Sequence, residues 1–165
     1  MRVQDVKSVS ALGREFCVFR GQSGKAGVLD AYCPHLGANI SAGGEVHGDC
    51  VTCPFHGWSF DASGECKHIP YSDSIPAKSS IRSYTFLELN DEILLWFDAE
   101  GREPQWFPPT LEAIANGAWT YRGMTQHPIN SHIQEVPENA ADVAHLNYLH
   151  GPCLLTGTDL RYSHK

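Results

Sequence analysis

The sequence predicts a mainly β protein that contains a small antiparallel β domain. Short apolar runs separated by turn residues recur between residues 14 and 100, and no helical periodicity crosses this stretch. Asn90-Asp91 separates two of these runs, which is typical of a β-hairpin with a two-residue turn. A succession of such strands favours an antiparallel β domain over a helical one.

The expected strands follow one another in chain order, each bounded by turn residues. They cover residues 15–20, 27–31, 44–53, 83–89 and 92–97. Glycines are expected where the backbone passes too close to a neighbour for a side chain. The candidates are Gly43, Gly44, Gly57 and Gly64.

A proline-rich connector separates the β region from a second region. Residues 104–109 hold three prolines, which interrupt both helices and sheets. Beyond it we expect a short helix over residues 110–116, closed by Gly117, and a strand over residues 118–123. A second helix is expected to open at Pro137, run through Asp142 toward His150 and end at Gly151. The expected domains are therefore 1–103 and 110–165, joined by the connector 104–109.

The composition is that of a globular protein and excludes two classes. The 165 residues are 42% hydrophobic and 19% charged, and their formal net charge is −7. A nucleic-acid-binding protein needs a basic face, so no nucleic-acid partner is expected. The longest strongly apolar run, residues 93–97, is far short of the ~20 residues of a membrane helix. Because residues 1–7 also lack the apolar core of a signal peptide, the chain itself is expected to be soluble.

Six cysteines and nine histidines are the unusual feature of this composition. Nothing marks secretion, and intracellular cysteines usually stay reduced or bind metal, so a disulfide framework is not expected. Four of the six have no second type of metal ligand at a suitable spacing and are expected to be inert thiols. These four are Cys17, Cys50, Cys66 and Cys153.

The other two cysteines each stand close to a histidine in a segment with Pro and Gly. Cys33 precedes His35 by two positions, and Cys53 precedes His56 by three. Two thiolates and two imidazoles suit either a tetrahedral zinc ion or a Rieske [2Fe–2S] cluster. Each segment supplies one Cys and one His, as two bridged irons require, so the cluster is favoured. A zinc-binding interaction module stays as an alternative.

These segments resemble the two metal-binding boxes of the Rieske family, and the resemblance covers residues 10–100. It implies an antiparallel β-sandwich that holds a [2Fe–2S] cluster. It also implies the ligands: Cys33 and Cys53 on one iron, His35 and His56 on the other.

Two departures separate the chain from respiratory-chain Rieske proteins. Those proteins have a further Cys in each box, which together form a disulfide, whereas this chain has Ala38 and Phe55 at those places. They also have a Ser and a Tyr that hydrogen-bond to sulfur, where this chain has Trp58 and Phe60. Fewer donors to sulfur favour the oxidised cluster, so we expect a potential of about −150 mV rather than about +300 mV. Such a potential is typical of an oxygenase or a ferredoxin.

A second group of candidate ligands lies in the expected helix that begins at Pro137. On a regular helix Asp142 and His145 lie about 60° apart, whereas His150 points about 140° away from His145. Both imidazoles can reach one metal only if the helix deforms or ends between them. Taken alone, two histidines and an aspartate on a helix are as often structural as functional.

The order Asp-x-x-His-x-x-x-x-His after a Rieske domain resembles the mononuclear iron motif of Rieske non-haem iron oxygenases. The resemblance implies that His145 and His150 bind Fe(II), with a third, carboxylate ligand absent from this chain. It implies that Asp142 is an electron bridge to the cluster of a neighbouring subunit in a head-to-tail homotrimer. It further implies that residues 110–165 begin an α+β, helix-grip-like catalytic domain, so the chain is expected to be an N-terminal fragment that is inactive by itself.

The amino-acid sequence of residues 126–142 and 145–152 is similar to that of the animal cholesterol 7-desaturases. The resemblance implies an O₂- and NAD(P)H-dependent conversion of cholesterol to 7-dehydrocholesterol, with a reductase as electron donor. It also implies a parent protein associated with the endoplasmic reticulum membrane. The alternatives are an oxygenase like the bacterial 3-ketosteroid 9α-hydroxylases and a Rieske ferredoxin. His127 and His132 are expected to be ordinary loop or strand residues.

Overall fold

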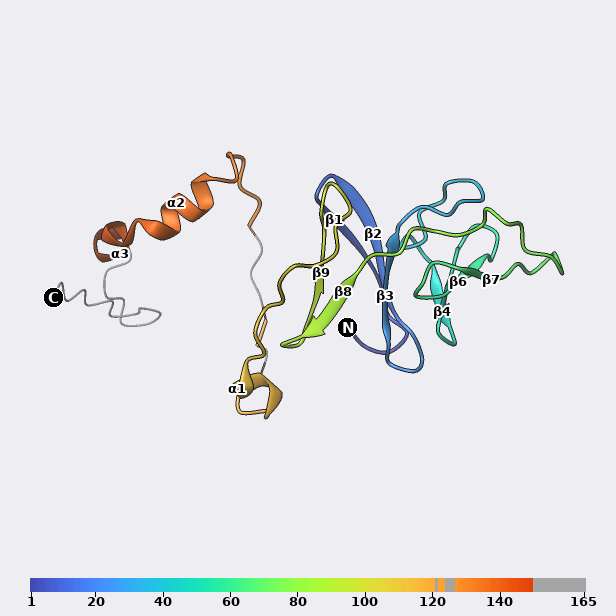
Figure 1. Ribbon diagram of the computed structural model, residues 1–165, viewed down its shortest axis with the longest axis horizontal. Helices are drawn as coiled ribbons and strands as arrows, with labels where there is room; N and C mark the ends of the chain where they lie inside the picture. The colour runs from blue at the N-terminus through green and yellow to red at the C-terminus, as the bar shows by residue number, and fades with distance from the viewer. Residues whose placement is uncertain (121, 124–126, 150–165) are drawn as a thin grey trace. The chain divides into compact units, whose positions relative to one another are not determined.

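The computed structural model describes residues 1–120, 122–123 and 127–149 (Figure 1). The chain divides into two compact units, Met1–Tyr121 and Arg122–Lys165. The first unit contains every strand of the described residues, and the second contains two short helices. The mainly β fold class predicted from the sequence is confirmed.

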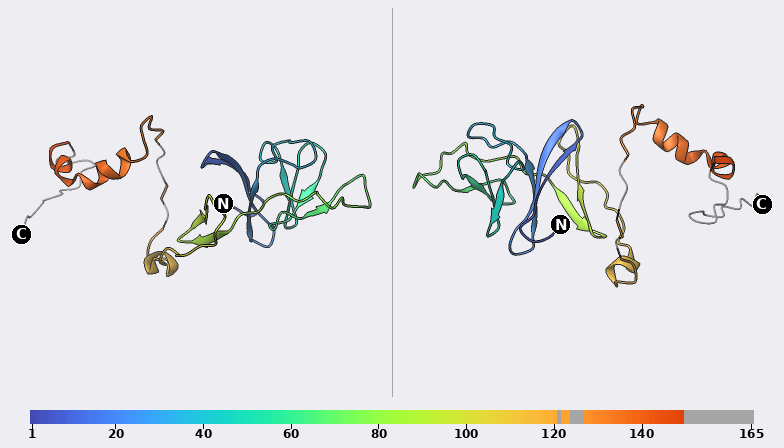
Figure 2. Two further views of the ribbon diagram at one scale, coloured as in Figure 1. Left: turned by 45° about the horizontal axis from the view of Figure 1, so that its top comes forward. Right: turned by 180° about the vertical axis from the view of Figure 1, so that it is seen from behind.

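The first sheet has three antiparallel strands, β1 (Val6–Ala11), β2 (Arg14–Arg20) and β3 (Ala26–Asp30), with β2 in the middle. Successive side chains of a strand point to opposite faces, and here both faces of β2 are covered. Cys17 and Phe19 enter one buried cluster, whereas Phe16 and Val18 enter another. This explains why the sequence of β2 is a continuous apolar run. The hairpin β1–β2 of this sheet is drawn in blue in both views of Figure 2.

The second sheet has four short antiparallel strands in sequence order. They are β4 (Glu45–His47), β5 (Cys50–Thr52), β6 (Ser59–Phe60) and β7 (Cys66–His68). The prediction of one strand over residues 44–53 is wrong, because the chain turns back between β4 and β5. Gly48 lies in this turn at φ 61°, a conformation that favours glycine.

The hairpin predicted at Asn90-Asp91 is confirmed. The strands β8 (Phe86–Leu89) and β9 (Glu92–Leu95) pair in register, and Asn90 and Asp91 have φ values of 54° and 63°. Two successive positive φ angles are those of a type I′ turn, whose twist matches that of the strands. The segment before β8 joins the first sheet through a bridge between Ser83 and Leu29.

After the connector the first unit ends in one helical turn, α1 (Glu112–Ala115). Gly117 follows it at φ 75°, so the predicted closure is confirmed. The strand predicted over residues 118–123 is wrong for the described part of that range. The chain instead turns back on α1, because Trp119 N–H donates to the Ala113 carbonyl at 2.7 Å.

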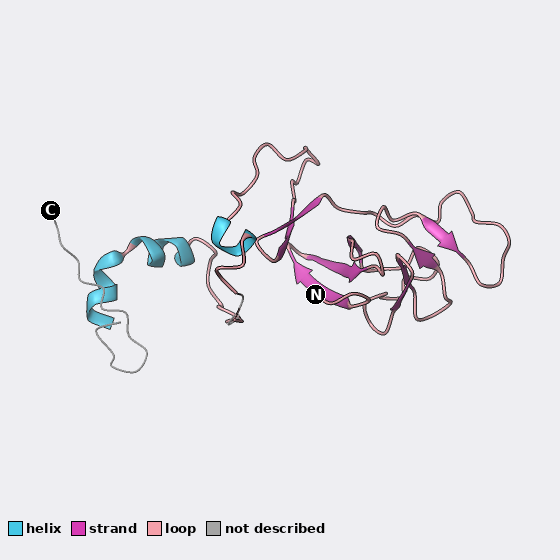
Figure 3. Cartoon of the chain, turned by 90° about the horizontal axis from the view of Figure 1, so that it is seen from below, coloured by secondary structure: helices cyan, strands magenta, loops and turns pink. Residues whose placement is uncertain are grey.

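The second unit contains two seven-residue helices, α2 (Glu135–Ala141) and α3 (Val143–Leu149) (Figure 3). Pro137 is the third residue of α2 and not its first, which costs no hydrogen bond within the first turn. The single helix predicted from Pro137 toward His150 is broken at Asp142, which has φ −78° and ψ 82°. His150 and the predicted helix end at Gly151 lie outside the described residues. Within the described part of the chain, no helix combines the length and apolar character needed to cross a membrane.

Candidate metal centre

The two Cys–His segments fold into loops with the same backbone hydrogen bonds. In the first loop, Cys33 N–H donates to the Ala38 carbonyl at 2.9 Å, and Gly37 N–H donates to the Cys33 carbonyl at 2.9 Å. In the second loop, Cys53 N–H donates to the Trp58 carbonyl at 2.8 Å, and Gly57 N–H donates to the Cys53 carbonyl at 3.0 Å.

Each of these loops therefore closes between its Cys and the residue five positions later. The closing glycines have φ values of 73° at Gly37 and 76° at Gly57. Because an L side chain rarely adopts that region, glycine four positions after the cysteine allows the closure. The loops are structural copies that present their cysteines from equivalent positions.

The two loop cysteines lie next to each other in the core. Both are buried in the cluster that also holds Ile40, Val51 and Phe60. Burial raises the pKa of the Cys33 thiol to about 11, and the neighbouring Cys53 adds to the rise, while a hydrogen bond from the His35 backbone N–H opposes it. A metal that binds there must displace the thiol protons, and the thiolates then bind in a water-poor environment.

The two loop histidines also meet. Their ring centroids are 4.6 Å apart, and the planes make an angle of 72°. His35 Nδ1 is buried and has no hydrogen-bond partner within the described part of the chain. A buried imidazole nitrogen without a partner is uncommon, and a metal ion satisfies its lone pair. The donor set of two buried sulfurs and two adjoining imidazoles therefore fits a [2Fe–2S] cluster.

Trp58 supports the first of these histidines from the second loop. Its indole stacks on the His35 imidazole with centroids 4.7 Å apart and an interplanar angle of 6°. The indole Nε1–H donates to the Tyr71 hydroxyl at 2.6 Å. No motif or spacing in the sequence points to Tyr71, because this contact joins residues from two loops.

The two residues at the positions of the disulfide cysteines of respiratory-chain Rieske proteins differ in burial. Ala38 packs partly buried against the core, whereas Phe55 is exposed and its ring lies 4.0 Å from that of His56. All five cysteines within the described residues are free. Cys17, Cys50 and Cys66 lie in β2, β5 and β7, and their role as inert thiols stays a prediction. Cys153 lies outside the described residues.

The second candidate site is described only in part. Asp142 stands between α2 and α3, and its carboxylate accepts a hydrogen bond from Ala144 N–H at 3.2 Å. It therefore acts as the N-cap of α3. His145 Nδ1 contacts the Asp142 backbone carbonyl and lies 3.7 Å from Asp142 Oδ2. The Asp142 side chain is 60% exposed.

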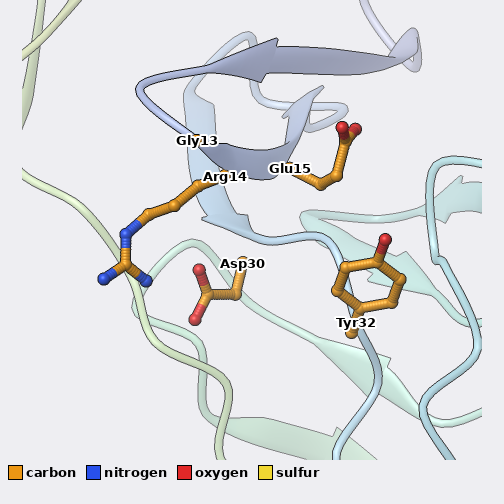
Figure 4. A pocket seen from close by; sticks show the side chains of 5 residues that line it. All are labelled: Gly13, Arg14, Glu15, Asp30 and Tyr32. Atoms are coloured by element: carbon orange, nitrogen blue, oxygen red, sulfur yellow. The ribbon is translucent and has the colours of Figure 1, made fainter.

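A shallow pocket in the first unit contains none of the predicted site residues. It encloses about 400 Å³ between Gly13, Arg14, Glu15, Asp30 and Tyr32. Figure 4 shows Arg14 and Asp30 on one side of it and Glu15 and Tyr32 on the other. Three charged side chains in so small a lining do not suit an apolar ligand such as a sterol.

Two family profiles match successive parts of the chain. The Rieske [2Fe-2S] domain profile matches residues 1–85. The profile of the 3-ketosteroid 9α-hydroxylase C-terminal domain matches residues 95–161. The first match contains both Cys–His loops, and the second contains Asp142, His145 and His150.

Curated relatives extend this similarity along nearly the whole chain. Cholesterol 7-desaturase nvd 1 of Ciona intestinalis is 50% identical over 94% of this chain and 33% of its own length. Cholesterol 7-desaturase nvd of Xenopus laevis is 48% identical over 96% of this chain and 35% of its own length. The oxygenase component of 3-ketosteroid-9-alpha-monooxygenase from Rhodococcus rhodochrous is 35% identical over 86% of this chain and 38% of its own length. The chain thus spans about a third of the length of these relatives.

Solved structures with the same fold are oxygenases too. Dicamba monooxygenase bound to 3,6-dichlorosalicylic acid matches with a TM-score of 0.76 and 25% identity, over 90% of this chain and 43% of that chain. Dicamba monooxygenase with non-haem iron and dicamba matches with a TM-score of 0.59 and 28% identity, over 65% of this chain and 33% of that chain. The order of a Rieske domain followed by the start of a second domain comes from the two profile matches, over residues 1–85 and 95–161.

Proposed function

Since the chain belongs to the Rieske [2Fe–2S] domain family, we propose that it is the electron-transfer domain and the beginning of the catalytic domain of a steroid-oxidising oxygenase. The observation that carries the proposal is the pair of matching loops, each with one buried sulfur and one imidazole. Cys33 and Cys53 would hold one iron, and His35 and His56 would hold the other. When bound, such a cluster supplies electrons one at a time.

The residues around the proposed cluster site would support electron transfer through the histidine side. The core around Cys33 and Cys53 excludes water, and the closing glycines hold both sulfurs on rigid loops. The two histidines lie nearer the surface, at half-buried positions, beside the exposed Leu36 and Phe55. Electrons can therefore leave through the imidazole side, while the sulfur side stays enclosed.

A mononuclear iron site is proposed around α3. His145 and His150 would supply two imidazole ligands to Fe(II), and a carboxylate from beyond this chain would supply the third. Asp142 would accept a hydrogen bond from a cluster histidine of a neighbouring subunit, which requires an accessible carboxylate. Its exposure supports this role, as does its contact with His145. The assembly proposed to bring these two residues together is a head-to-tail homotrimer.

The proposed reaction of the longer protein is the 7-desaturation of cholesterol. Cholesterol loses two hydrogen atoms and NAD(P)H supplies two electrons, so that O₂ is reduced to two water molecules and 7-dehydrocholesterol is formed. The support is the identity of 48–50% to cholesterol 7-desaturases of two animals. An NAD(P)H-dependent reductase is the proposed electron donor, and association with the endoplasmic reticulum membrane would bring the enzyme to its lipid substrate.

A second candidate is hydroxylation of a 3-ketosteroid, and the profile match over residues 95–161 favours it. The two candidates differ in substrate and outcome, since one removes hydrogen from a 3-hydroxysterol and the other adds oxygen to a 3-ketosteroid. A Rieske ferredoxin, the third possibility, has no use for Asp142 and His145. Incubation of the full-length protein with cholesterol and with a 3-ketosteroid, followed by mass spectrometry, separates the first two.

The test of the oxygenase proposal is His145→Ala in the full-length protein, with His127→Ala as the matched control. His127 is an exposed histidine of the same unit. We expect His145→Ala to abolish turnover while the cluster spectrum stays intact, and His127→Ala to leave both unchanged. Full turnover by His145→Ala would refute the iron site, and loss of the cluster spectrum would refute the separation of the two sites.

A further inference from the structure

Trp58 connects a surface residue with a proposed cluster ligand. On one side its indole lies parallel to the His35 imidazole, 4.7 Å away between centroids. On the other side its Nε1–H donates to the Tyr71 hydroxyl at 2.6 Å. Trp58 is 8% exposed, whereas Tyr71 is 61% exposed. The three side chains therefore form a continuous path from the surface to the imidazole.

Tyr71 is held in place from the backbone side. Ile69, two positions earlier, is buried in the same core cluster as Cys33 and Cys53. Between them Pro70 packs on the second loop so closely that a Cβ at Gly57 would lie 2.7 Å from its Cγ. Ser72 N–H donates to the Ile69 carbonyl at 3.2 Å and closes a turn around Tyr71. This anchored turn thus places the Tyr71 hydroxyl within hydrogen-bonding distance of the Trp58 indole.

The two proposed histidine ligands have different aromatic neighbours. His35 has the indole of Trp58 parallel to its ring, while Phe55 lies tilted at 45° beside His56. A parallel ring restricts the tilt of an imidazole about its metal bond, and a tilted neighbour restricts it less. The indole also presents its negative π face to His35, and hydrogen bonding at Nε1–H increases that negative character.

We propose that Tyr71 is a positioning residue that acts on His35 through Trp58. Its hydroxyl fixes the indole against the imidazole and polarises it, which orients His35 and favours the oxidised cluster. The inference rests on the proposed role of His35 as an iron ligand. Loss of the hydroxyl should therefore change the electronic environment of one histidine and make the cluster easier to reduce.

The experiment compares Tyr71→Phe with Tyr32→Phe in the cluster-loaded protein. Tyr32 is also exposed and precedes the ligand Cys33, but its hydroxyl has no hydrogen-bond partner in the part of the chain that the structure describes. Redox titration gives the ratio of reduced to oxidised cluster at a fixed ambient potential, and pulsed EPR gives the ¹⁴N couplings of the two histidines. We expect Tyr71→Phe to keep the cluster, to raise that ratio on the order of twofold and to shift one of the two couplings. Tyr32→Phe should change neither.

A double variant separates the proposed route from any other. In a Trp58→Phe background the indole N–H is gone, so Tyr71→Phe should have no further effect on the ratio or on the couplings. An undiminished effect of Tyr71→Phe in that background would overturn the inference. So would a Tyr71→Phe single variant identical to the parent protein, or one in which both couplings shift equally. A parent protein without any histidine coupling would instead refute the ligand assignment itself.

Discussion

The two proposed metal sites differ in what holds their residues in place. Cys33 and Cys53 are fixed by matching loops, a shared buried core and glycine-dependent closures, all within the first unit. Asp142 stands between two short helices and His145 lies on the second of them, and α2 has no buried residue. Large apolar side chains of that unit, among them Ile133 and Tyr148, are exposed. The residues proposed to bind the cluster are therefore held in place by packing within one unit, whereas the helix that precedes the residues proposed to bind iron contributes nothing to a buried core.

The largest effect is expected when one of the two sulfurs is removed. Cys53→Ser should abolish cluster binding, because a neutral hydroxyl does not replace a thiolate on iron. Iron and sulfide content and visible absorption after reconstitution measure the loss. Cys50→Ser, three positions earlier in β5, is the matched control and should retain the full content. Retention of the cluster by Cys53→Ser would contradict the ligand assignment.

The difference in packing predicts a second, smaller contrast. Ile40 is 0% exposed and Ile133 is 82% exposed. Ile40→Ala should lower the free energy of unfolding by about 2–4 kcal/mol, since it leaves a cavity in the core. Ile133→Ala should change it by less than about 0.5 kcal/mol. Urea unfolding of the 165-residue chain measures both, and comparable losses would show that the second unit is packed as firmly as the first.

A third variant tests how tightly Pro70 packs against the second Cys–His loop. Gly57→Ala combines a positive φ with a clash against Pro70, whereas Gly13→Ala has a similar φ of 68° and no heavy atom within 4 Å. Backbone strain alone costs about 1 kcal/mol, and the Pro70 contact should bring the cost of Gly57→Ala to about 2–3 kcal/mol. Thermal unfolding of the two variants measures the difference. Equal losses would mean that Pro70 yields without cost.

The smallest expected effect on stability concerns the start of α3. Asp142→Ala removes the N-cap and should weaken the helix by about 1 kcal/mol, while Asp142→Asn keeps an accepting oxygen and should cost only a few tenths. Amide hydrogen exchange in α3 reports this as roughly fivefold faster exchange in the Ala variant. In the full-length protein, Asp142→Asn should nevertheless slow turnover strongly, because the proposed electron bridge needs the carboxylate. An Asn variant with full turnover would leave Asp142 a capping residue only.

Local signals in the sequence predicted the parts of the fold that local physics determines. The Asn90-Asp91 turn, the closure at Gly117 and the buried run of β2 were confirmed because each depends on neighbouring residues. The edge strand β1 was missed, since its residues are mostly exposed and it exists through pairing with β2. In the described part of residues 118–123 the predicted strand was wrong, because a hydrogen bond from Trp119 N–H back to α1 outweighed the apolar pattern.

The candidate site divides in the same way. The spacing of Cys33, His35, Cys53 and His56 predicted two equivalent loops, and the structure brings the two sulfurs next to each other and the two imidazoles next to each other. The break at Asp142 was missed, although an aspartate before an apolar helix is a known capping signal. Trp58 against His35, and Tyr71 against Trp58, could not be predicted because these contacts join residues from different loops.

The central claim is that two imidazoles and two thiolates of this chain bind one [2Fe–2S] cluster. Pulsed EPR of the reconstituted and dithionite-reduced 165-residue chain tests it most directly, with His35→Cys and His56→Cys as comparisons. We expect an EPR-active cluster with ¹⁴N couplings from two coordinating histidines, and the loss of one coupling in each variant that still binds iron. An EPR-silent, colourless protein, or a cluster signal without nitrogen coupling, would contradict it.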